Sequence, residues 1–219
     1  MPDAEISSPE NPAAPEAATP ARKRPKPGER RVQILEALAT MLEQPGAERI
    51  TTAALAARLD VSEAALYRHF ASKAQMFEGL IEFIEQSVFT LVNQIMEREA
   101  TGKDAADTGV RQAAKVVAML LQFAEKNPGM TRVMVGDALV FENERLQQRM
   151  NQFFDKIEST LKQSLRAPGA EGSATPSVDA QVRASLLTAF VVGRLQRFAR
   201  SGFKRAPSEH LEASLARML

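Results

Sequence analysis

The sequence predicts an all-α protein with a small N-terminal three-helix unit and a larger helical bundle behind it, about nine helices in all. After residue 28, apolar residues recur at spacings of three and four along nearly every segment, which is the period of an amphipathic helix. No segment alternates apolar and polar residues as a half-buried strand does. Two short predicted helices joined by a tight turn belong to the small unit, and the long helices follow them. We therefore divide the chain into a tail (1–28), a three-helix unit (29–73) and a bundle (74–219).

The first 28 residues differ in composition from the rest of the chain. They hold seven of the twelve prolines, many alanines and no hydrophobic periodicity. Such a segment cannot bury enough apolar surface to offset its ordering entropy, so we expect a disordered tail. Its basic end, ARKRPKPGERR, is either a solubilising segment or an arm that contacts phosphate.

Two helices follow the tail. The first begins at Glu29 and ends at Pro45-Gly46. Its predicted apolar stripe consists of Val32, Leu35, Leu38 and Leu42. The second follows Thr51-Thr52, and either hydroxyl can cap its N-terminus. Its apolar face consists of Leu55, Ala56 and Leu59.

A tight turn at Asp60-Val61 leads to the third helix, which Ser62 caps and which ends near Phe70. At about 100° per residue, Leu66 and Phe70 fall on one side and face the first two helices. The opposite, outward side carries Ala64, Tyr67 and Arg68, with His69 at its border.

The remaining helices form the bundle. Ser72 and Gln75 make an S-x-x-Q capping box that opens a long fourth helix, which runs to about Arg98. Its predicted core stripe is Phe77, Leu80, Ile81, Ile84, Val88, Leu91 and Ile95. Further helices are predicted over 108–126, 129–136, 140–166, 177–201 and 208–218. Ser208 is the expected cap of the last one.

Composition argues against several classes of function. The chain has no cysteine and two histidines, which excludes thiolate metal sites and cysteine nucleophiles. It shows no glycine-rich phosphate loop, no paired-carboxylate motif and no run of about 18 apolar residues. We expect no enzyme, metal, cofactor or membrane span. The N-terminus lacks the apolar region of a secretory signal, so we expect a cytoplasmic protein.

The net charge of +1 is unevenly distributed. Residues 22–73 carry ten Lys/Arg and six Asp/Glu, a net of +4, so the rest of the chain sums to −3 (18 against 21). A basic N-terminal third on an acidic body indicates an anionic partner at that end.

The geometry of the third helix makes DNA the best candidate for that partner. A short helix, a tight turn and a second short helix with a polar outward face is the helix-turn-helix arrangement, whose second helix enters the major groove. Tyr67, His69 and Lys73 carry the donors that bind phosphate oxygens. The alternatives are that Tyr67 is a half-buried core residue and that Arg68 is a solvated surface charge. His69 has no ligand-type residue at i+4, which argues against a metal site.

The run ITTAALAARLDVSEAALYRHFASKAQMFEGLI, residues 50–81, closely resembles the DNA-binding segment of TetR-type regulators. That resemblance implies a TetR-like fold and dimerisation through the last two helices. Two positions depart from the pattern. Asp60 stands where glycine is usual, but Asp tolerates the left-handed conformation, so the turn should persist. Ala71 replaces a common proline and only loosens the end of the third helix. The DNA-binding residues that this resemblance and the outward face imply are Thr51, Thr52, Ser62, Glu63, Ala64, Tyr67, Arg68, His69 and Lys73.

Beyond this segment the chain resembles the nucleoid occlusion factors, a branch of the same family. The resemblance rests on LIEFIE at 80–85, EKNPGMTRVM at 125–134, ALVFENERLQQRMNQFFDKIE at 138–158 and SGFK at 201–204. It implies a division inhibitor, associated with the nucleoid, that binds chromosomal double-stranded DNA and the tubulin-like division protein FtsZ together and prevents Z-ring assembly over the nucleoid.

One residue of the fourth helix lies outside its core stripe. Phe83 falls at about 240° when Phe77 is set at 0°, so it is either packed against a neighbouring helix or exposed for a partner. The resemblance implies that the FtsZ tail lies in a groove between the fourth and fifth helices. The residues it implies for this groove are Phe83, Gln86, Lys126 and Asn127. Leu91 stands where the resemblance suggests an arginine.

A further expectation concerns assembly. The helix over 177–201 carries an apolar stripe with small residues, which favours a homodimer built with 208–218; the alternative is packing on its own subunit. That stripe consists of Val182, Leu186, Ala189, Phe190 and Gly193.

The alternative function is a ligand-responsive TetR-type transcriptional repressor, which needs an apolar pocket with a few polar groups. The candidate lining is Met119, Leu120, Phe123, Met130, Met134, Phe153 and Phe154, which core packing explains equally well. The bundle has no tyrosine or tryptophan to orient a ligand, so we expect no small-molecule ligand.

Overall fold

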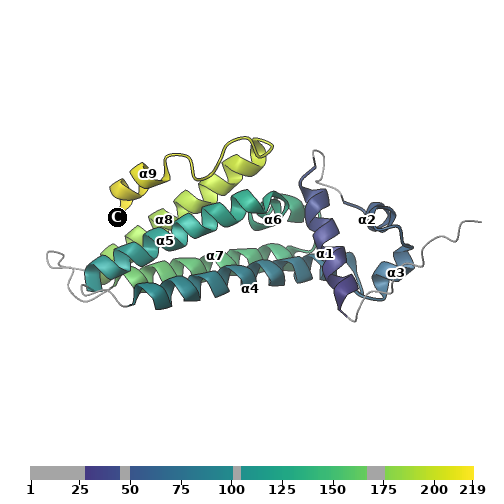
Figure 1. Ribbon diagram of the computed structural model, residues 1–219, viewed down its shortest axis with the longest axis horizontal. Coiled ribbons are helices and arrows are strands. Elements are labelled where there is room, and N and C mark those ends of the chain that lie inside the picture. Colours follow the sequence, from purple (N-terminus) through teal and green to yellow (C-terminus); the bar gives the residue numbers. More distant parts are fainter. Residues whose placement is uncertain (1–27, 45–49, 101–104, 167–175) are drawn as a thin grey trace, which may run out of the picture.

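The computed structural model describes residues 28–44, 50–100, 105–166 and 176–219. Within these residues the chain forms nine α-helices, one short 3₁₀ helix and no strand, which confirms the all-α prediction (Figure 1). The helices of the N-terminal unit are α1 (Glu29–Leu42), α2 (Thr52–Arg58) and α3 (Glu63–Tyr67). The others are α4 (Lys73–Glu99), α5 (Ala105–Lys126), α6 (Pro128–Met134), the 3₁₀ helix η2 (Asp137–Leu139), α7 (Glu144–Leu165), α8 (Pro176–Arg200) and α9 (Leu211–Met218). The expected disordered tail and the Pro45-Gly46 end of α1 lie outside the described residues.

Four long helices build the body of the molecule. Helices α4, α5, α7 and α8 lie side by side along its length, and α6 packs across one end of α5 (Figure 1). Phe153 of α7 is fully buried at the centre of this bundle and makes edge-to-face contacts with Phe89 and Phe154, at ring-centroid distances of 5.6 and 5.1 Å. Helix α9 runs beside α8 and buries none of its residues fully. None of the described helices is both long and apolar enough to cross a membrane.

The N-terminal unit sits at one end of the body (Figure 1). Helix α1 packs against α4 and α6, and α2 packs against α1 and α3. Leu55, Leu66 and Phe70 fill the space between these three helices and are almost completely buried. The predicted inward side of the third helix is therefore confirmed, and its opposite side faces outward.

Most of the predicted helix starts are confirmed. Thr51 accepts a hydrogen bond from the Ala54 amide at 3.1 Å, and Ser62 accepts one from the Ala65 amide at 3.3 Å. Ser72 caps α4 through the Gln75 amide at 3.2 Å. The return bond of this capping box is shifted by one residue, because the Gln75 side chain accepts from the Ala71 amide, at 2.9 Å.

The predicted turn at Asp60 is also confirmed. Asp60 has a φ of +53°, in the left-handed region that glycine usually occupies. The amide of Val61 donates to the carbonyl oxygen of Ala56 at 3.0 Å and closes the turn behind α2. Asp therefore takes the place of glycine here without loss of the helix-turn-helix connection.

Several predicted helix boundaries are wrong, and for three of them the contacts give the reason. Helix α3 ends at Tyr67 rather than near Phe70, because the chain tightens into a turn in which the His69 and Phe70 amides both donate to the Leu66 carbonyl. Helix α7 begins at Glu144 rather than at residue 140, because Asn143 caps it. Ser208 does not cap α9: its hydroxyl and amide donate to Glu125 of α5, and α9 begins after His210.

Two residues of the predicted core stripes are exposed. Val32 on α1 is 53% exposed, and Leu91 on α4 is 38% exposed. The buried line of α4 passes from Ile84 and Val88 to Val92, at strict spacings of four, and so leaves Leu91 beside it. Periodicity therefore identified the apolar side of each helix. It did not show which part of that side a neighbouring helix covers.

Candidate DNA interface and partner groove

The outward side of α3 and the start of α2 form one polar surface. The Tyr67 ring is 44% exposed, and its hydroxyl lies 3.4 Å from the hydroxyl of Thr52. The Thr52 hydroxyl in turn donates to the carboxylate of Glu63 at 2.5 Å. Thr52, Glu63 and Tyr67 are therefore brought together from two helices. The core alternative for Tyr67 is not supported, because its ring lies on the exposed side.

The other predicted DNA-binding residues extend this surface. Those that are exposed on it are Thr51, Ser62, Ala64, Arg68 and His69. The guanidinium of Arg31 donates to the His69 carbonyl at 3.0 Å and lies 4.1 Å from the centre of the Phe70 ring. Arg31 thus fixes the end of the third-helix turn from α1. Sequence reasoning did not assign it this role, because the contact spans 38 residues.

Lys73 lies at the first residue of α4 and is partly buried, whereas Tyr67 is exposed. Its ammonium group forms an ion pair with Glu142, in the connection between η2 and α7, and lies 5.7 Å from the centre of the Phe77 ring. Its side chain is 30% exposed and that of Glu142 only 11%. The sequence did not predict Glu142 as the partner of Lys73, because no local pattern indicates a contact between residues 69 positions apart.

Phe83 is exposed, as one of the two predicted alternatives requires. Its side chain is 48% exposed and lines a small apolar pocket of about 110 Å³. Helices α1, α4 and α6 supply the lining, which is Val32, Leu35, Glu36, Leu80, Phe83 and Met130. The hollow beside Phe83 is therefore built with α1 and α6, whereas the resemblance implied the fourth and fifth helices. We call this hollow the Phe83 groove.

The other residues assigned to the FtsZ site lie outside the lining of the Phe83 groove. Lys126 is exposed at the last residue of α5. Asn127 precedes α6 and donates to the Phe123 carbonyl at 2.8 Å, which orders the junction of the two helices. Gln86 is exposed on α4, one turn beyond Phe83, and its amide lies 3.4 Å from Glu82. Met130, three residues after Asn127, joins this junction to the groove.

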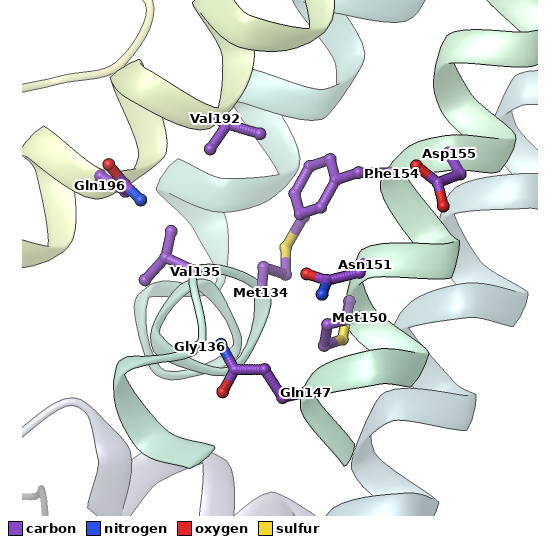
Figure 2. Close-up of a pocket in the computed structure, with 10 residues that line it drawn as sticks. All are labelled: Met134, Val135, Gly136, Gln147, Met150, Asn151, Phe154, Asp155, Val192 and Gln196. Atoms are coloured by element: carbon purple, nitrogen blue, oxygen red, sulfur yellow. The ribbon is translucent and has the colours of Figure 1, made fainter. Parts of the chain in front are cut away.

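A second pocket, of about 350 Å³, lies between α6, α7 and α8. Figure 2 shows Met134, Phe154 and Val192 directed into the space between these helices, with Gln147, Asn151 and Gln196 around them. Of the residues named for a ligand site, Met134 and Phe154 line this pocket, whereas Leu120 and Phe153 are fully buried core. The polar groups that could orient a ligand are three amides and the carboxylate of Asp155.

Helix α8 carries an apolar stripe that its own subunit does not cover. Val178, Val182 and Leu186 follow one another at spacings of four and are each more than half exposed. Ala189 is also exposed, and a Cβ built on Gly193 would meet nothing within 4 Å. These positions leave room for a second helix to approach closely, as the predicted homodimer requires.

No group of three or more His, Asp or Glu side chains is placed to hold a metal ion in the described part of the chain. The pKa of the Arg149 guanidinium is raised by its hydrogen bond to Glu85, and the pair ties α7 to α4 with distances of 2.7 and 3.2 Å. Charged groups in the bundle thus serve to join helices.

Comparison with known proteins places this geometry in a family. Residues 34–80 match the family described as bacterial regulatory proteins, tetR family, and residues 106–218 match the SlmA-like family described as tetracyclin repressor-like, C-terminal domain. The chain is 50% identical over 184 residues to the nucleoid occlusion factor SlmA of Idiomarina loihiensis, covering 84% of this chain and 90% of that protein. It is 53% identical over 188 residues to the protein of the same name from Aliivibrio fischeri strain MJ11, covering 85% and 92%.

Solved structures agree with this fold at much lower identity. A TetR transcriptional regulator from Legionella pneumophila superposes with a TM-score of 0.65 at 16% identity, over 90% of this chain and 99% of that one. FadR from Bacillus subtilis, solved in complex with stearoyl-CoA, gives a TM-score of 0.63 at 14% identity, over 85% and 96%. These two likenesses establish the fold alone.

Proposed function

This chain belongs to the SlmA-like branch of the TetR family, and from that premise we propose that it is a DNA-associated inhibitor of cell division. As a nucleoid occlusion factor it binds chromosomal DNA and FtsZ together and prevents Z-ring assembly over the nucleoid. The observation that carries this proposal is the identity of half the residues over nine-tenths of relatives that bear that name.

The DNA-binding part of the proposal rests on the exposed side of α3. Tyr67 and His69 offer hydroxyl and imidazole donors to phosphate, and Ser62 and Ala64 stand early in the helix, where side chains reach base edges. A two-fold dimer through α8 and α9 would present two such helices to a pseudo-palindromic site.

The FtsZ-binding part rests on the Phe83 groove. Phe83 is half exposed beside an apolar hollow, and such a surface can hold the apolar anchor of a short peptide. Lys126 supplies a cationic contact at the nearby junction of α5 and α6. Because α1 lines this groove, a peptide bound there would touch both the DNA-binding unit and the body.

The test is binding of purified FtsZ to the full chain with and without double-stranded DNA. We expect FtsZ to be retained by the immobilised protein and retention to persist in the presence of random genomic DNA. Failure to retain FtsZ under either condition would refute the division-inhibitor function and leave a TetR-type DNA-binding protein.

The second candidate function, a ligand-responsive repressor, has one observation in its favour. The 350 Å³ pocket between α6, α7 and α8 combines apolar side chains with four polar groups (Figure 2). A thermal-shift screen of small molecules tests it, because a ligand that fills this pocket stabilises the folded state.

A further inference from the structure

Lys73, which the proposed function assigns to DNA binding, is paired with Glu142 in the structure. Lys73 is the first residue of α4 and follows directly on the third-helix turn. Its ammonium group is turned toward the connection between η2 and α7, where it meets the Glu142 carboxylate. The ammonium has three N–H donors, and a donor given to this carboxylate is not available to a DNA phosphate.

The Glu142 carboxylate is largely buried and needs a partner for its charge. Its side chain is 11% exposed, and Lys73 is its only side-chain partner among the described residues. A carboxylate taken out of water without a partner is costly, so burial of Glu142 favours its contact with Lys73. A carboxylate and a phosphate offer the ammonium the same chemistry, which is an anionic oxygen acceptor.

We propose that Glu142 is an internal competitor of DNA phosphate for Lys73, and that DNA binding exchanges the carboxylate for a phosphate. This inference rests on the proposed DNA-binding function and adds its regulation. The exchange lowers DNA affinity below what Lys73 alone would give, and it frees the η2–α7 connection from the start of α4. In this scheme Glu142 is a positioning residue that acts through Lys73.

The exchange reaches into the body of the molecule through neighbouring residues. The Glu142 amide donates to the Leu139 carbonyl at 3.0 Å and belongs to the turn that precedes α7. Gly136, before η2, and Gln147, in the first turn of α7, line the 350 Å³ pocket. Release of Glu142 therefore loosens the segment that forms one wall of this pocket.

The test is a double-mutant cycle on DNA binding by the full chain, measured by fluorescence anisotropy with a labelled duplex. Glu142→Gln removes the charge while keeping the size and an acceptor for Lys73. We expect it to raise DNA affinity about two- to fivefold, the range of a partly exposed ion pair. In a Lys73→Ala background the same change should raise affinity by far less, because the competition is gone.

Two matched variants separate competition from simpler effects. Glu144→Gln removes an equal charge from an exposed residue two positions away and should leave affinity nearly unchanged. Glu85→Gln weakens the ion pair of α4 with Arg149 of α7, which does not involve Lys73, and should also leave affinity nearly unchanged. A gain with either control equal to that with Glu142→Gln would overturn the proposal.

The remaining outcomes are distinguishable. If Lys73→Ala lowers affinity but Glu142→Gln does not raise it, the competition is refuted and the DNA-binding function stands. If Lys73→Ala has no effect on a protein that binds DNA, Lys73 makes no phosphate contact and the inference fails with it. If the wild-type chain binds no duplex, the proposed function itself fails. As a second readout, amide exchange at Glu142 should accelerate on DNA binding in the wild type and not in Lys73→Ala; unchanged exchange refutes the release.

Discussion

Gly129 of α6 lies directly against the backbone of Ala39 of α1. A Cβ at residue 129 would meet the Ala39 carbonyl oxygen far inside the 3.0 Å that real Cβ atoms keep. This approach is where the DNA-binding unit rests on the body, and the Phe83 groove lies beside it, between the same two helices and α4. The packing of α1 on α6 therefore sets both the orientation of the unit and the shape of the groove.

The first prediction is that Gly129→Ala destabilises the protein. The added methyl group meets a backbone atom, which cannot rotate away, so α6 must shift from α1 at a cost of about 2 kcal/mol or more. Urea unfolding followed by circular dichroism measures this free energy. Gly193→Ala is the control, because its added methyl group meets nothing within its own chain. Gly193 lies on the stripe of α8 that we assign to the dimer, so any loss of stability in this variant should depend on protein concentration. An unchanged midpoint for Gly129→Ala would refute the close contact between α6 and the backbone of α1.

The second prediction concerns phosphate contacts. Tyr67→Ala and Lys73→Ala should weaken binding to specific and to non-specific DNA alike, because phosphate contacts carry no sequence information. Loss of Lys73 should also lower the slope of log K against log salt by roughly one unit. Filter-binding titrations at several salt concentrations measure both quantities. Lys156→Ala, which removes an exposed cation from α7, is the control and should change neither.

The third prediction separates base reading from phosphate binding. Ser62 and Ala64 lie at the start of α3, where side chains of a recognition helix reach base edges. Substituting either residue should change which sequence is preferred and should leave non-specific affinity nearly intact. Selection of preferred sites from a random duplex pool measures the preference. Identical preferences for the wild type and both variants would place α3 outside the major groove.

The fourth prediction tests the partner groove. Phe83→Ala should keep DNA binding and dimerisation but lose FtsZ binding, because it removes the apolar anchor beside the groove. The measurement is anisotropy of a labelled FtsZ C-terminal peptide titrated with the DNA-bound protein. Phe141→Ala removes an equally large and even more exposed aromatic outside the lining of the groove, and should bind the peptide normally. Full peptide affinity in folded Phe83→Ala would exclude the groove as the site.

The fifth prediction tests the dimer. Truncation before α8 is unsuitable, because Leu187, Val191 and Leu195 of that helix belong to the subunit's own core. Leu186→Glu instead places a charge on the exposed stripe and should shift the sedimenting species from dimer to monomer. Val140→Glu makes a similar change at an exposed apolar residue outside α8 and serves as the control. A dimeric Leu186→Glu variant would place the interface elsewhere.

Features that depend on neighbours along the chain could be predicted from the sequence. The caps at Thr51, Ser62 and Ser72 were predictable, because each hydroxyl serves an amide three residues away. The left-handed turn at Asp60 was expected from the TetR-type resemblance, because Asp60 stands where glycine is usual. The exposure of Phe83 was predicted as one of two alternatives from its angle on α4. The caps and the angle of Phe83 depend only on helical geometry within a few residues.

Contacts between distant helices could not be predicted from the sequence. The ion pair of Lys73 with Glu142 joins residues 69 positions apart, and no periodicity anticipates it. Exposed Val32 was predicted as core, because its stripe is apolar, but α1 turns that end of the stripe toward the Phe83 groove. Helical periodicity identifies the side of a helix that avoids water. The neighbour that covers that side is chosen by the packing of the whole bundle, which a single helix does not encode.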